Sequence, residues 1–166
     1  MRLRENLNFL VMKTILSSIF LIATTQLFAQ VEPVSKDKVA IGGYDLVAYF
    51  MPGKATKGNP EIKSVHKGIT YYFSSSSNRD AFALNPEKYL PQYDGWCALA
   101  IGQQKKKVNI NPETFKVTDG KLYLFYNSSH KLSGTKFNSL EPWVKDENNL
   151  ILKANANWSA INGVKK

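Results

Sequence analysis

Cysteine is almost absent from this chain, which has only Cys97 in 166 residues. A single thiol excludes an internal disulfide and a zinc site of four thiolates. Histidine is also rare: His66 and His130 are the two present, and neither has a second His or a Cys at metal-ligand spacing. A metal or catalytic site would therefore have to be assembled from parts of the chain that lie far apart in sequence.

The chain also lacks an apolar run of the roughly 20 residues that span a bilayer. Its longest run, Ile15 to Ala29, contains Ser, Thr and Gln, follows Lys13 and ends on a small residue, which is typical of a cleaved signal peptide. We therefore expect a mature protein that is periplasmic or secreted and not transmembrane. The alternative is an uncleaved anchor lengthened by residues 9–12, which would place Lys13 in the hydrocarbon at a cost of about 2–3 kcal/mol.

Acidic residues are outnumbered, with 13 against 22 basic ones, and the net charge of +9 hints at an anionic partner. Removal of residues 1–29 takes away three basic and one acidic side chain and leaves +7. Export makes nucleic acid an improbable partner, and the Lys105–Lys107 cluster is interpreted as a solvated turn. The partners that we expect are a small ligand, a metal or an exported protein.

The remaining composition, 43% hydrophobic and 12% aromatic, is that of one folded domain. Alternating apolar runs at 61–65 and 69–73 flank a Gly-containing turn and predict a hairpin. Asp119-Gly120 predicts a second hairpin that leads into 121–126, where both faces are apolar, as in a central strand. Strands are also expected at 108–110 and 115–118, on either side of a turn at 111–113.

Helix signals occupy the other segments. Ser77 to Asp80 has capping-box spacing and predicts a helix that starts at Ser76 or Ser77, and Asn85-Pro86 predicts a second short helix. The first helix should direct Ala81, Phe82 and Leu84 inward. The apolar segment 95–102 must be buried, as a helix or as a strand. From Asn127 onward the pattern is helical, with Pro142 near a helix start and one apolar face made by Leu150, Ile151, Ala154 and Trp158.

Together these patterns predict a small α+β domain of antiparallel hairpins packed on short helices. The expected division is a signal peptide at 1–29, a flexible arm at 30–38, a domain at 39–160 with a C-terminal strand and helical extension, and a disordered tail at 161–166.

Three motifs carry a family resemblance: Lys67 to Phe73 (KGITYYF), Asn78 to Phe82 (NRDAF) and Asn85 to Leu90 (NPEKYL). They closely resemble the YHS domain, a small module related to treble-clef metal-binding domains. Ile41 to Phe50 (IGGYDLVAYF) and Tyr93 to Ala98 (YDGWCA) are similar to a subgroup of exported bacterial YHS proteins.

The resemblance implies a metal site that this chain lacks. Metal-handling YHS domains carry one cysteine after Asp-Pro-Val and two in a Tyr-Phe-Cys-x-x-x-Cys run, and these positions are Ala48, Ser74 and Asn78 here. Soft metals such as Cu(I) need thiolate or thioether ligands, so the family's usual site does not transfer.

The one thiol of the chain, Cys97, is either a small buried core residue or a thiol that binds a metal, a cofactor or a partner thiol. Trp96 lies beside it, His130 follows a predicted strand, and Tyr72 belongs to the first hairpin, so these four are the candidate ligand-binding residues. Cys97 and His130 form the candidate metal pair, for a transition metal such as copper, and haem is the candidate organic cofactor. His66 is interpreted as a solvated turn residue.

Two functions follow from this sequence. The first is an exported binding module that presents Cys97 and nearby aromatic residues to a metal, a cofactor or a small ligand. The second is a structural or interaction domain without metal. An enzyme is not expected, because no local motif supports Cys97 with His130 as nucleophile and base.

Overall fold

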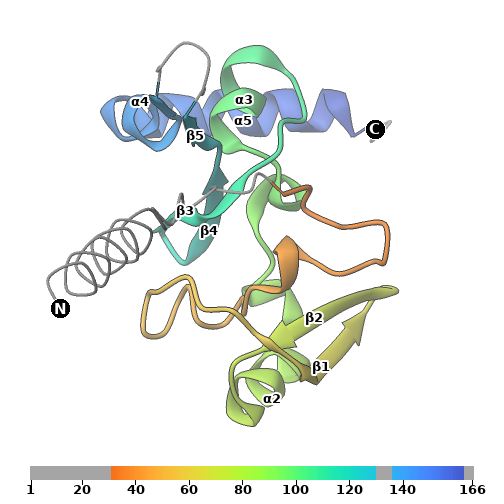
Figure 1. Cartoon of the computed structure of the whole chain (residues 1–166). Helices are drawn as coiled ribbons and strands as arrows, with labels where there is room; N and C mark the ends of the chain where they lie inside the picture. Colours follow the sequence, from red (N-terminus) through yellow and green to blue (C-terminus); the bar gives the residue numbers. More distant parts are fainter. Residues whose placement is uncertain (1–30, 130–135, 163–166) are drawn as a thin grey trace, which may run out of the picture.

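The computed structural model describes residues 31–129 and 136–162. Within them, two-stranded antiparallel sheets and short helices confirm the predicted α+β class. Figure 1 shows the β1–β2 hairpin and α2 at one end of the molecule, α3, α4 and α5 at the other, and β3 and β4 between. The predicted signal peptide and His130 lie outside the described residues.

Strands β1 (Asn59–His66) and β2 (Ile69–Phe73) form the first predicted hairpin. The turn residues Lys67 and Gly68 have φ values of 50° and 76°. Positive φ at both turn positions matches the right-handed twist of the paired strands, which explains why so short a turn closes this hairpin. The predicted alternation is also confirmed, since Tyr71 and Phe73 are both buried.

Helix α2 (Ser76–Leu84) begins where the sequence predicts. Its capping residue is Ser75 rather than Ser76 or Ser77, and the Ser75 hydroxyl accepts a hydrogen bond from the backbone N–H of Asn78 at 3.1 Å. The second short helix is confirmed as the single 3₁₀ turn η2 (Pro86–Lys88).

The inward face of α2 is narrower than expected. Phe82 is fully buried, and its ring centroid lies 4.7 Å from that of Tyr71 and 5.2 Å from that of Phe73. Leu84 is 89% exposed, so its inward prediction is wrong. It follows Phe82 by two residues, or about 200° around the helix axis, and therefore faces away from the hairpin.

The apolar segment 95–102 becomes a helix for most of its length. The 3₁₀ helix η3 (Gln92–Gly95) precedes α3 (Ala98–Gln104), whose residues 98–102 are all buried. α3 packs on α5 and β4. A Cβ at Gly102 would lie 3.2 Å from the Leu150 carbonyl oxygen, so glycine is what lets these helices approach closely.

Strands β3 (Asn111–Thr118) and β4 (Lys121–Phe125) form the second hairpin, with Asp119-Gly120 at its turn. The turn predicted at 111–113 is wrong, because these residues begin β3 and a register shift before Phe115 accommodates the irregularity. β4 is not a central strand, since its sheet has two strands. Its residues 122–125 are buried on both faces because helices and η3 cover them.

The sequence predicts a helical segment from Asn127 onward, but the first helix of this region begins only at Leu140. β5 (Asn127–Ser129) pairs with β6 (Lys136–Asn138) before α4 (Leu140–Lys145) and α5 (Glu147–Ile161) begin. No helix in the described ranges is both long and apolar enough to cross a membrane.

The arm predicted at 30–38 is held against the domain from Val31 onward. Val31 and Ile110 exchange two backbone hydrogen bonds of 2.8 and 3.0 Å. Pro33 is buried, and its carbonyl accepts the backbone N–H of Ile41 at 2.7 Å, just where η1 (Ile41–Gly43) begins. The charged side chains of this segment are exposed, whereas its backbone is hydrogen-bonded to the domain at Val31 and Pro33.

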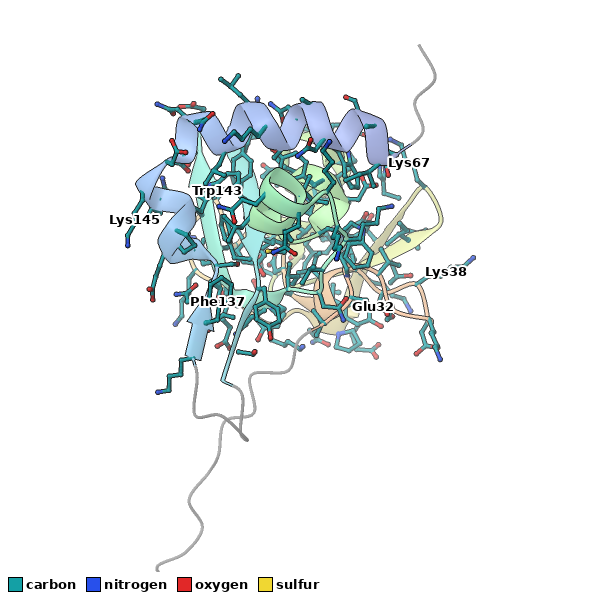
Figure 2. All side chains as sticks on the ribbon, turned by 90° about the horizontal axis from the view of Figure 1, so that it is seen from above. Glu32, Lys38, Lys67, Phe137, Trp143 and Lys145 are labelled. Atoms are coloured by element: carbon teal, nitrogen blue, oxygen red, sulfur yellow. The ribbon has the colours of Figure 1, made fainter. Side chains whose placement is uncertain are left out.

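A half-buried carboxylate, that of Glu147, joins the C-terminal helices to β3. Trp143 belongs to α4 and lies below α5 in Figure 2, and its indole N–H donates to Glu147 Oε1 at 3.1 Å. The Thr118 hydroxyl donates to the same oxygen at 2.8 Å, and the Lys116 ammonium bonds to Oε2. Burial raises the pKa of the Glu147 carboxyl, but these donors lower it by more, so its pKa lies below the ordinary value.

We expect Glu147→Gln to lower the free energy of unfolding by about 1–2 kcal/mol at neutral pH, because the ion pair and the charge-assisted bonds are lost. A lowered native pKa stabilises the fold above the unfolded-state pKa, and this stabilisation is lost as pH falls through the native pKa. Urea unfolding of both proteins should therefore show a gap at neutral pH that closes in acid. Glu141→Gln, on the exposed face of α4, is the control, and an equal effect there would contradict the prediction.

Candidate functional site

Asp45 is fully buried and accepts five hydrogen bonds. Its Oδ1 accepts the backbone N–H groups of Val47 and Ala48 at 2.9 and 3.3 Å. Its Oδ2 accepts the backbone N–H and the hydroxyl of Ser74 at 2.8 and 2.6 Å, and the side-chain amide of Asn78 at 2.7 Å. These donors replace the water that a buried carboxylate loses.

The positions that the resemblance marks as thiolate ligands all adjoin this carboxylate. Ala48 offers only a methyl group, and Ser74 and Asn78 direct their hydrogens at Asp45. These residues do not fit a soft metal, which requires sulfur ligands. In the described part of the chain there is also no group of three or more His, Cys, Asp or Glu side chains that could hold a metal ion.

Cys97 is 1% exposed and lies at the start of α3. Its Sγ accepts the backbone N–H of Tyr126 at 3.4 Å and lies 3.3 Å from the Ser139 hydroxyl. It also borders a cavity of about 160 Å³, the Cys97 pocket, whose mainly apolar wall includes the exposed Phe137. The thiol thus contacts two neutral groups, and its predicted metal partner, His130, lies outside the described residues.

The other predicted site residues do not join Cys97. Trp96 has extended backbone angles (φ −70°, ψ 156°), so its side chain and that of Cys97 point to opposite sides of the chain, and Trp96 borders a different cavity. Tyr72 packs over Gly43 and Gly58, where an added Cβ would lie 2.9 and 2.5 Å from atoms of Tyr72. The structure therefore does not bring Cys97, Trp96 and Tyr72 together.

The cavity beside Trp96 measures about 440 Å³ and lies between the tip of the β1–β2 hairpin and the segment that leads into α3; we call it the hairpin pocket. Its walls combine apolar, aromatic and charged side chains. They come from Pro33, Val34, Ala40, Ile41, His66, Lys67, Ile69, Tyr71, Glu87, Leu90, Pro91, Asp94 and Trp96. Lys67 of this pocket and Phe137 of the Cys97 pocket lie on opposite sides of the molecule in Figure 2.

An ion-pair cluster forms one edge of the hairpin pocket. Glu87 Oε1 lies 2.7 Å from the Lys67 ammonium and 3.3 Å from Nε2 of His66. The hydrogen bonds from Lys67 and His66 lower the pKa of the Glu87 carboxyl. His66, which the sequence predicts to be a solvated turn residue, is therefore a wall residue of the pocket.

Two backbone segments beside the pocket have left-handed conformations. Ile41 and Tyr93 have φ values of 47° and 57°, which are unusual for residues with large side chains, and Asp94 continues the run at 51°. The two segments meet at Gly95, where an added Cβ would lie 2.8 Å from Ile41 Cδ1. Strained backbone of this kind concentrates at functional sites.

Comparison of the chain with curated proteins and with solved structures found no match. A scan against family models found one domain, the YHS domain, which matches residues 47–93. The match begins just after Asp45 and covers β1, β2 and α2. It also contains His66, Tyr71 and Glu87 of the hairpin pocket, whereas Asp94 and Trp96 lie beyond it. The pocket is therefore built where the YHS domain meets the rest of this chain.

Asp45→Ala should lower the free energy of unfolding by about 3 kcal/mol, because five donors lose a charged acceptor in a buried setting. Asp80→Ala removes a carboxylate from an exposed position of α2 and should change stability by less than about 0.5 kcal/mol. Denaturant unfolding of both variants checks this. Similar losses in both would show that Asp45 does not hold the fold together.

Cys97→Ala should lower unfolding stability by about 1–2 kcal/mol and leave the metal content of the purified protein unchanged. The expected loss comes from the Tyr126 N–H, which would be left without its acceptor. Elemental analysis and thermal unfolding measure the two effects, with Cys97→Ser as the variant that keeps an acceptor. A stoichiometric metal that is present in the wild type and absent from both variants would contradict this.

Proposed function

Because residues 47–93 match the YHS domain, we propose that the protein is a binding module built on that domain, with a small organic molecule held in the hairpin pocket. The observation that carries this proposal is the pocket itself. Its volume of about 440 Å³ falls in the range of small-molecule sites. Apolar walls with a few convergent polar groups are also typical of such sites.

A YHS domain suggests a metal-associated module, but the residues of this chain support an organic ligand better. The family's thiolate positions hold Ala48, Ser74 and Asn78, and their polar groups are directed at Asp45. The hairpin pocket, in contrast, offers aromatic rings and ionised groups together, as Trp96, Tyr71 and Asp94 illustrate. We propose that the YHS framework is retained as a scaffold and that its metal chemistry is lost.

The proposed place of action is outside the cytoplasm, because the apolar run at residues 15–29 is typical of a signal peptide. The proposed role is binding rather than catalysis. Cys97 does not line the hairpin pocket, and no other residue of the chain offers a thiol nucleophile.

A fragment screen by NMR tests the proposal with the protein's own tryptophans as probes. Two of the chain's three indole N–H groups serve as probe and control: Trp96 borders the hairpin pocket, whereas Trp143 is buried and bonded to Glu147. We expect fragments that shift the Trp96 indole signal and leave that of Trp143 in place.

A pair of variants then checks the location. Ile69→Trp should fill the hairpin pocket and weaken the binding of these fragments by at least about tenfold, a change of about 1.4 kcal/mol in binding free energy. Val65→Trp makes the same kind of change on the same hairpin at a position that is 65% exposed, and should leave binding unchanged. The proposal fails if no fragment shifts Trp96, or if both variants bind equally well; should Ile69→Trp not fold, the Trp96 signal alone decides.

A further inference from the structure

The hairpin pocket has two carboxylates, those of Glu87 and Asp94, but within the described part of the chain a cationic partner for only one of them. Glu87 shares its carboxylate with Lys67 and His66 at the pocket edge. Asp94 forms no ion pair among the described residues, and its Oδ2 has one polar contact there, the Asn162 side-chain amide at 3.4 Å. The pocket thus contains one carboxylate that a neighbouring cation does not neutralise.

Both carboxylates act on the same aromatic residue. Burial raises the pKa of the Tyr71 hydroxyl, and the charges of Glu87 and Asp94 raise it further. Two carboxylates of the pocket therefore contribute a negative potential at Tyr71. Trp96 provides a second aromatic ring in the same pocket. Aromatic rings attract cations through their quadrupole, most strongly for Trp and Tyr and most effectively away from water.

We infer, on the basis of the proposed function, that the ligand of the hairpin pocket is a small organic ammonium ion. Its cationic nitrogen would lie near the Asp94 carboxylate and the rings of Trp96 and Tyr71, and its hydrocarbon part against Ile69 and Leu90. Lys67 does not oppose this arrangement, because its ammonium is already bonded to Glu87.

Three probes that share one shape separate charge from size: choline, its uncharged carbon isostere dimethylbutanol, and the anion dimethylbutanoate. Phenethylammonium tests a primary amine. Titration is followed by the Trp96 indole N–H signal. We expect at least one of the two cations to bind about tenfold more tightly than dimethylbutanol, and dimethylbutanoate to bind more weakly still.

The matched variants are Asp94→Asn and Asp119→Asn. Both aspartates have a φ of 51°, a conformation that asparagine also adopts readily, and Asp119 belongs to the β3–β4 turn, outside the pocket. Asp94→Asn should remove most of the preference for the cation, and Asp119→Asn should keep it.

The outcomes separate this inference from the proposed function. If neither cation binds better than the uncharged probe, or if Asp94→Asn keeps the full preference for the cation, the ammonium inference is wrong. Any fragment that binds at Trp96 still supports a small-molecule site in that case. If no probe and no fragment shifts Trp96, the proposed function fails with it.

Discussion

The buried carboxylate of Asp45 is the interaction on which the YHS part of this fold depends. It holds three pieces of chain at once: the turns that follow it, the end of β2 at Ser74, and the first turn of α2 at Asn78. A metal bound by three thiolates would join the same three pieces at Ala48, Ser74 and Asn78. Hydrogen bonds to a carboxylate can therefore replace the crosslink that a metal provides, and the hairpin and helix keep their relative placement.

The elements that the sequence predicts well are those encoded by neighbouring residues. Asp119-Gly120 and the run ending in Gly68 each specify a tight turn, and the flanking alternation then sets the register. The first residues of β3 differ from the prediction because Pro112 is typical of a turn, whereas the structure accommodates it at a register shift of a two-stranded sheet. β5 is not predicted by the sequence, because a strand of three residues has too little alternation to be distinguished from a helical pattern.

The candidate site was harder to predict for a physical reason. Trp96 and Cys97 are neighbours in sequence, but one extended residue is enough to send their side chains into different cavities. The hairpin pocket collects residues from Pro33 to Trp96, so its walls are set by tertiary packing. The close approach of Gly95 to Ile41, which brings two of these segments together, is likewise not revealed by any spacing in the sequence.

The net positive charge of the chain suggests an anionic partner, whereas the charges of the hairpin pocket suggest a cationic ligand. Most lysines of the described residues are exposed, and salt screens exposed charges beyond about 8–10 Å. At the pocket, the nearest lysine, Lys67, is paired with Glu87 at 2.7 Å and contributes little net field. A ligand in contact with Asp94 and Trp96 would experience these close groups more strongly than the distant lysines, because Coulomb attraction weakens as the separation grows. The proposed cationic ligand therefore follows from the local charge of the pocket and not from the net charge of the chain.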